Sequence, residues 1–88
     1  MPFDKSDDIL ALANHTRYGL AASIWTRDIS TAHRLGRGLA TGAVWINCFG
    51  VFDPNLPFGG MKESGWGREM GQEGVEAFTE VKAIMVWL

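Results

Sequence analysis

The chain has 88 residues, of which 47% are hydrophobic and 20% are charged, and its formal net charge is −2. This composition is typical of a folded globular protein and argues against disorder. The sequence shows no basic stripe and no run long enough to span a membrane, so we expect neither nucleic acid nor membrane as a partner. Its single cysteine, Cys48, excludes an intrachain disulfide. We expect a cytoplasmic protein with one domain at most, or part of one.

The first expected element is a short helix near the amino terminus. Ser6 is a candidate N-cap, and the two carboxylates after it favour the positive end of the helix dipole. Residues 14–16 are expected to end this helix. The nearly continuous apolar run over residues 20–26 then predicts a strand that is buried on both faces, as in a parallel sheet.

A second helix and a second strand are expected to follow. Asp28 is a plausible cap, and residues 41–42 supply a stop. Apolar or small residues recur at helical spacing between them: Ile29, Ala32, Gly36, Leu39 and Ala40. Residues 43–49 form a second apolar run. Strand, helix and strand within about thirty residues predict a βαβ unit with a right-handed crossover.

A glycine-rich loop over residues 50–67 comes next, followed by a weak helix at about 68–79 and a β-prone segment, Val81 to Leu88. Ordering that segment costs roughly 1–2 kcal/mol per residue for the backbone, so a half-buried strand would gain nothing. An exposed apolar edge would also promote aggregation. We therefore expect another chain, or sequence beyond these residues, to cover it.

Several motifs in the second half of the chain carry a family resemblance. They are Trp45-Ile46-Asn47, Pro57-Phe58-Gly59-Gly60, Lys62-x-Ser64-Gly65-x-Gly67-Arg68-Glu69 and Thr79-Glu80-Val81-Lys82. In order and spacing they closely resemble the C-terminal end of the NAD(P)-dependent aldehyde dehydrogenase superfamily. The segment from Tyr18 to Asp28 is similar to the part of that family that leads into these motifs, so the resemblance covers about residues 3–88. The amino-acid sequence of residues 51–60 resembles most closely that of the broad-specificity and aromatic-aldehyde branches of the family.

The resemblance implies an α/β fold that is part of an aldehyde dehydrogenase. Residues 1–80 would be the C-terminal part of the catalytic domain, with the βαβ unit, the glycine-rich loop and the short helix. Residues 81–88 would be an oligomerisation strand that pairs with a neighbouring subunit. The implied partner is a second copy of the chain, a homo-oligomer through Val81 to Leu88, or a longer homologous subunit.

The resemblance also implies a role for the loop. In the family, the segment matching residues 50–58 forms one wall of the tunnel that delivers the aldehyde to the catalytic thiol. Phe52 and Phe58 match apolar tunnel positions, and Gly50 matches a position where side-chain size adjusts access. An aromatic wall desolvates the aldehyde, and Pro54 and Pro57 stiffen it because they fix φ.

The family's reactive groups find no match among these residues. The resemblance calls for a cysteine nucleophile, a glutamate base and a dinucleotide-binding domain, all on the amino-terminal side of the matching region. NAD or NADP is the cofactor that the resemblance implies for the parent enzyme, and none is expected for this chain alone. We expect a truncated or excised C-terminal fragment of an enzyme that oxidises an aldehyde to a carboxylate, inactive in isolation.

Simpler interpretations remain beside these. Cys48 is expected to be a small buried residue, since its only possible bases, His15 and His33, fit surface positions better than a dyad. The phenylalanines of the loop could fill a core, and the glycines at 65–67 could cradle a phosphate. Turn geometry, with Lys62, Arg68 and Glu69 in ion pairs or helix-end contacts, is the interpretation that we favour at 65–67.

A second class of function is also open. The chain could be a non-enzymatic, self-associating or partner-docking α/β module. The apolar terminal segment, in which Trp87 is expected at an interface, motivates this alternative.

Overall fold

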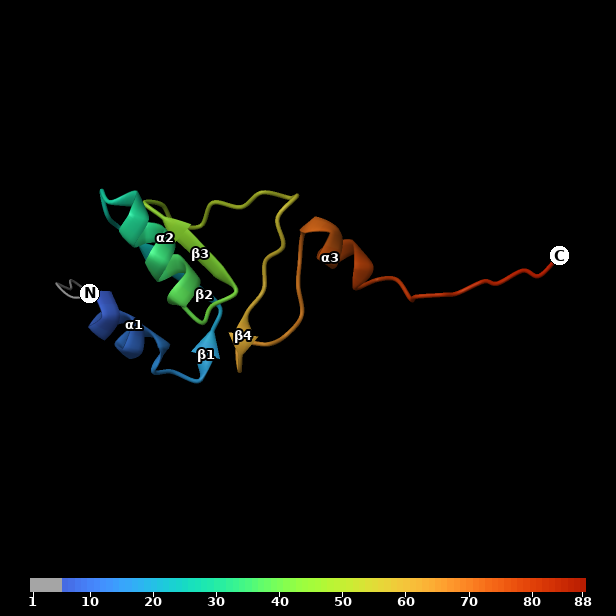
Figure 1. Ribbon diagram of the computed structural model, residues 1–88, viewed down its shortest axis with the longest axis horizontal. Coiled ribbons are helices and arrows are strands. Elements are labelled where there is room, and N and C mark those ends of the chain that lie inside the picture. Colours follow the sequence, from blue (N-terminus) through green and yellow to red (C-terminus); the bar gives the residue numbers. More distant parts are fainter. Residues whose placement is uncertain (1–5) are drawn as a thin grey trace.

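Residues 6–88 are described by the structure, a computed structural model drawn in Figure 1. In chain order the elements are α1 (Ser6–Asn14), β1 (Tyr18–Gly19), β2 (Ala21–Ile24), α2 (Ile29–Gly38), β3 (Ala43–Ile46), β4 (Met61–Lys62) and α3 (Gly71–Glu76). Within residues 6–88, no helix has the length and apolar character to cross a membrane.

The predicted βαβ unit is present. Strands β2 and β3 pair in parallel, from Ala21 opposite Ala43 to Ile24 opposite Ile46, and α2 connects them. Each strand has four residues and is shorter than its apolar run, because the chain turns away from the pair at Trp25 and at Asn47.

The core of the described residues is small and lies between α2 and the parallel strands. Its buried hydrophobic side chains are Ile24, Ala32 and Leu35. Ile29 was expected on the buried face, and that expectation was wrong, since its side chain is 62% exposed. A two-stranded sheet presents too little surface to bury the whole apolar face of α2.

The ends of the two longer helices are fixed by polar side chains. Asp28 caps α2, as predicted, and accepts a hydrogen bond from the amide of Ser30 at 3.2 Å. The helix ends at Gly38, earlier than the expected stop at 41–42. Helix α1 ends at Asn14, as expected, and the side chain of Asn14 bonds to the carbonyl of Gly38 and the amide of Ala40, each at 2.8 Å. The Ser6 side chain, a predicted N-cap, lies outside the described part of the chain.

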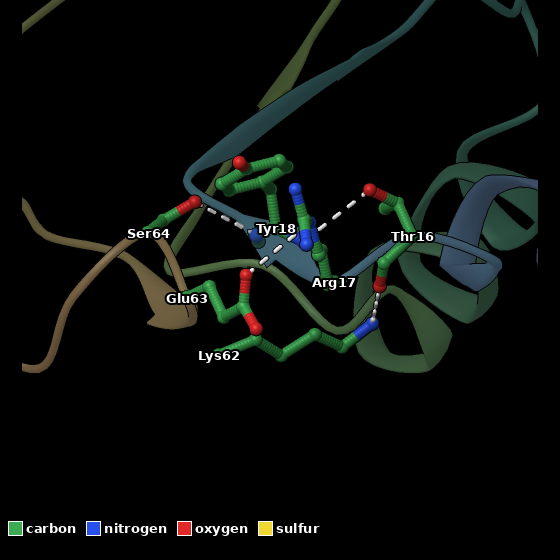
Figure 2. Close-up of polar contacts among 7 residues, drawn as sticks. Thr16, Arg17, Tyr18, Lys62, Glu63 and Ser64 are labelled. Atoms are coloured by element: carbon green, nitrogen blue, oxygen red, sulfur yellow. Dashed lines mark hydrogen bonds and ion pairs between the residues drawn. The ribbon is translucent and has the colours of Figure 1, made fainter.

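A short antiparallel pair that the sequence did not predict joins the start of the chain to the end of the loop. Strand β1 pairs with β4, with Tyr18 opposite Lys62. Figure 2 shows the polar contacts around this pair. The Lys62 ammonium donates to the carbonyl oxygen of Asn14, the last residue of α1, at 3.0 Å. It also donates to the carbonyl oxygen of Thr16 at 3.1 Å (Figure 2). This is the helix-end contact expected for Lys62, and it ties the loop to α1.

Two further contacts strengthen the same junction. The amide of Gly19 donates to the hydroxyl of Ser64 at 2.9 Å, and Arg17 pairs with Glu63 at 3.3 Å (Figure 2). The two charged side chains are largely exposed, so the ion pair adds little by itself. Together these contacts fix where the loop returns to the body of the protein.

The C-terminal part differs most from expectation. Helix α3 spans Gly71–Glu76, against an expected 68–79, and has no side-chain N-cap. The strand expected over residues 81–88 is not formed in this chain; the segment is exposed and extends away from the other elements (Figure 1). A strand needs a hydrogen-bonded neighbour, and no neighbouring strand flanks this segment within residues 6–88.

Candidate functional site

The candidate site begins where the chain leaves the carboxyl end of β3. Asn47 adopts a positive φ of 54°, and its side-chain amide bonds to both the amide and the carbonyl of Thr26, each at 2.9 Å. The hydroxyl of Ser23 donates to the carbonyl of Cys48 at 3.0 Å. These contacts direct residues 47–60, here called the aromatic loop, away from the sheet at a fixed point.

Four aromatic rings gather beside this exit. The ring centroid of Trp45 lies 5.3 Å from that of Phe49, 5.6 Å from that of Phe52 and 6.3 Å from that of Phe58. Phe52 and Phe58 meet edge to face at 5.1 Å. We call these four residues the aromatic cluster. Such ring pairs are favourable beyond their burial, so the cluster is a defined feature of the loop.

The aromatic cluster borders an open pocket of about 310 Å³. The pocket is lined by Gly42, Ala43, Val44, Trp45, Val51, Phe52, Asp53, Leu56, Pro57 and Phe58. This volume fits the low end of small-molecule sites, and the lining is mostly apolar. Phe49 is 77% and Phe52 51% exposed, so these two rings do not fill a core within this chain. Phe58 is half-buried.

The far end of the aromatic loop is held by backbone contacts. Phe58 and Glu69 exchange two hydrogen bonds between their backbone groups, both at 2.7 Å. A guanidinium nitrogen of Arg68 donates to the carbonyls of Gly60 and Gly67 at 2.7 and 2.9 Å. The wall of the pocket is therefore fixed at both ends, near Asn47 and near Phe58.

Gly50 lies apart from the pocket. It is exposed, has a φ of 68°, and a Cβ placed on it would meet nothing within 4 Å. Its backbone conformation alone favours glycine. A side chain at this position would project into open space within this chain.

The two other chemical interpretations find little support. Cys48 is free and half-buried, while His15 and His33 are exposed on other parts of the fold. Gly65 has a φ of 109°, and its amide bonds to the carbonyl of Lys62, so residues 62–65 form a turn. Helix α3 starts only at Gly71 and has six residues. Residues 6–88 contain no group of three or more His, Cys, Asp or Glu side chains that could hold a metal ion.

Trp45, Val51 and Leu56 are among the lining residues that the sequence analysis did not single out. The contact of Trp45 could have been predicted, because a tryptophan in the strand directly before a loop with three phenylalanines is well placed to pack against them. The contacts of Val51 and Leu56 could not, since a loop without periodicity does not reveal which side chains turn inward.

Fold and site together define a small α/β unit. In it, the aromatic loop follows the second strand of a parallel pair and lies beside an apolar pocket. Over residues 1–84 the sequence matches the aldehyde dehydrogenase family. The chain is 52% identical over 85 residues to the 2-aminomuconic semialdehyde dehydrogenase of Danio rerio, which covers 97% of this chain and 18% of the relative. It is 46% identical over 86 residues to a putative aldehyde dehydrogenase, DhaS, of Bacillus subtilis, covering 98% of this chain and 17% of that protein.

Solved structures agree with the sequence match. An NAD+ complex of aldehyde dehydrogenase from Bacillus cereus superimposes with a TM-score of 0.91 at 43% identity, covering 98% of this chain and 18% of the other. Indole-3-acetaldehyde dehydrogenase AldA of P. syringae, in complex with NAD+, gives 0.91 at 41% identity, with coverage of 98% and 17%. The chain therefore belongs to the aldehyde dehydrogenase family, and it spans about a sixth of the length of these relatives.

Proposed function

We propose that this chain forms the C-terminal part of an NAD(P)-dependent aldehyde dehydrogenase, where it supplies one wall of the passage that brings the aldehyde to the reactive thiol. The supporting observation is the pocket of about 310 Å³ beside the aromatic cluster, in a chain that belongs to this family. The parent reaction is the oxidation of an aldehyde to a carboxylate, with hydride transfer to NAD or NADP.

Phe52 and Phe58 have the central roles in this proposal. Both line the pocket, and their edge-to-face contact gives an apolar surface against which the carbon chain or ring of an aldehyde can pack. Gly50 is proposed to leave room for the aldehyde to enter the passage, because it has no side chain. This role requires other parts of the complete subunit to lie close to Gly50. One relative is named for 2-aminomuconic semialdehyde and another for indole-3-acetaldehyde. Because the second of these is a bulky aromatic aldehyde, the proposed substrates include bulky apolar aldehydes.

The thiol, the general base and the dinucleotide-binding residues are proposed to lie outside this chain. NAD is the favoured cofactor, because solved relatives hold NAD+. The 88-residue polypeptide, mixed with aldehyde and NAD, is then expected to produce no reduced cofactor by absorbance. The longest natural polypeptide that contains it is expected to do so. Turnover by the short chain, or none by the long one, would overturn the proposal.

The terminal segment, Val81 to Leu88, is proposed to pair with another subunit. Its large apolar side chains are exposed, with Trp87 at 99% and Leu88 at 111%. An extended apolar strand with unpaired backbone groups is suited to adding to the edge of a sheet in a neighbouring chain. The same segment favours the non-enzymatic alternative, a self-associating or partner-docking module. Aldehyde turnover by the longer polypeptide separates the two.

A further inference from the structure

We infer that Trp45 is a positioning residue: its indole holds the aromatic loop in the shape that admits bulky apolar aldehydes. The inference rests on the proposed function and names the residue on which its selectivity for substrate size depends. Trp45 acts through Phe52 and Phe58, whose rings it orients, and through the backbone at Val51.

The first observation concerns the different surroundings of the four rings. Trp45 lies in β3, opposite Ser23 of β2, and its side chain is half-buried. The three phenylalanines stand on the aromatic loop, outside regular secondary structure apart from the single bridge at Phe58. Each of them contacts the indole within 6.3 Å between ring centroids. The indole, held by the strand, is therefore the surface against which the three phenylalanine rings of the loop are placed.

The second observation is a hydrogen bond that a phenyl ring could not make. The indole nitrogen of Trp45 donates to the carbonyl oxygen of Val51 at 2.8 Å. Val51 stands between Phe49 and Phe52, so this bond fixes the backbone in the middle of the wall. Tryptophan combines a large apolar face with a single donor, which is what this position uses.

The third observation is that this stretch has few other ties. Among the hydrogen bonds between described residues, the indole bond to Val51 is the one that reaches residues 49–52. The neighbouring ties are at Cys48 on one side and at Asp53 on the other, where the carbonyl of Asp53 accepts from the amide of Leu56. Loss of the indole bond would free four consecutive residues at the rim of the pocket.

The expected consequence depends on the size of the substrate. Val51 and Phe52 line the pocket, so a loosened stretch over residues 49–52 presents a less ordered wall. A bulky apolar aldehyde uses that wall for binding, whereas acetaldehyde is too small to depend on it. Ordering the wall on binding then weakens the affinity for the bulky substrate alone.

The test uses the longest natural polypeptide that contains this chain, with Trp45→Phe as the main variant. It keeps an aromatic ring and removes the donor. We expect limited proteolysis by thermolysin to cleave within residues 49–52 roughly fivefold faster, because the loss of one hydrogen bond raises the population of the locally opened loop by about that factor. KM for benzaldehyde should rise about fivefold, while KM for acetaldehyde and both kcat values stay within about twofold.

Two matched variants separate positioning from other effects. Trp66→Phe is the control, because Trp66 is 94% exposed and outside the cluster, and it should change neither the rate of proteolysis within residues 49–52 nor the kinetics. Phe52→Leu trims the wall directly, so it should raise KM for benzaldehyde without faster proteolysis of this stretch.

The possible results distinguish failure of the positioning role of Trp45 from failure of the proposed function. Unchanged proteolysis within residues 49–52 in Trp45→Phe, or an equal effect on both aldehydes, overturns the positioning role while the proposed function stands. A wild-type protein that oxidises neither aldehyde overturns the proposed function instead. Faster proteolysis of this stretch together with a KM increase confined to benzaldehyde supports the inference.

Discussion

Gly42 lies at the start of β3, where the returning aromatic loop passes over it. A Cβ placed on Gly42 would lie 1.5 Å from the carbonyl oxygen of Gly59, and one placed on Gly59 would lie 2.2 Å from the carbonyl oxygen of Gly67. These are backbone atoms, which cannot rotate out of the way. The two glycines therefore allow the loop to close against the βαβ unit.

Gly42→Ala is expected to displace the end of the aromatic loop and lower the free energy of unfolding by about 3 kcal/mol, as for other overpacked sites. Urea unfolding followed by far-UV circular dichroism measures the change. Gly67→Ala is the matched control, because a Cβ on Gly67 meets nothing within 4 Å. Equal unfolding midpoints for the two variants would contradict this account of the junction.

Asn47 offers a second test at a single position. Asn47→Gly keeps the positive φ and removes both hydrogen bonds to Thr26, so it should cost about 1–2 kcal/mol of unfolding free energy. Asn47→Ala removes the same bonds and adds a strained backbone, worth about 1 kcal/mol more. Unfolding in urea should rank wild type, glycine and alanine in that order. Alanine equal to glycine would show that the positive φ costs nothing.

For α2, the first turn depends on one carboxylate. A hydrogen bond from the hydroxyl of Thr31, together with the amide of Ser30, lowers the pKa of Asp28 below its ordinary value of 3.8. A lowered pKa in the folded state means that the charged carboxylate stabilises the fold. That stabilisation is complete above the ordinary pKa and is lost as the pH falls through the lowered one.

Asp28→Asn is therefore expected to keep a cap, because asparagine also accepts from the helix amides, while removing this part of the pH dependence. Asp28→Ala loses the cap at every pH and should be the less stable variant at pH 7. Thermal unfolding at pH 7 and at pH 3 checks both. A wild-type protein and an asparagine variant that lose stability equally on acidification would contradict the assigned role.

The molecule as a whole is extended. Its radius of gyration is 17.3 Å, and its extents are 66 × 25 × 24 Å, whereas a compact chain of this length has a radius of about 12 Å. Figure 1 shows the cause, because the segment after α3 runs away from every other element. The apolar side chains of that segment are exposed, so association with another surface is the expected state in solution.

Replacing Ile84 and Val86 together by lysine should abolish that association. The two residues are two positions apart, so in an extended segment their side chains lie on the same face. Light scattering after size exclusion is expected to show oligomers for the wild-type chain. The double variant should stay monomeric up to protein concentrations at least about tenfold higher than those at which the wild-type chain associates. Glu80→Lys, which changes charge outside the segment, is the control. A monomeric wild-type chain at high concentration would contradict this prediction.

The sequence was sufficient to predict the parts of the fold that depend on local patterns. The apolar runs at 20–26 and 43–49 located the parallel strands, and Asp28 located the start of α2. The pair of β1 with β4 escaped prediction, because two-residue strands carry no periodicity and their partners are over forty residues apart. The strand expected over 81–88 was predicted to pair with another chain, and it stays a prediction, since no strand within residues 6–88 pairs with this segment.

The candidate site was predicted less completely. Phe52 and Phe58 were singled out by resemblance, and the structure brings them together at the pocket, whereas Gly50 stands apart from it. The contribution of Trp45 was missed. Its importance comes from a hydrogen bond to Val51, six residues further along the chain, and such a bond depends on how the loop folds back. Sequence patterns report burial and periodicity, and they do not report loop closure.

The small core has a consequence for any copy of residues 6–88 that is separated from the rest of a subunit. Ile24, Ala32 and Leu35 are the buried hydrophobic side chains among these residues, and a polypeptide with so little protected surface would be triaged by chaperones and proteases. A separated copy that docks onto a companion subunit would be shielded, and one that does not would be degraded.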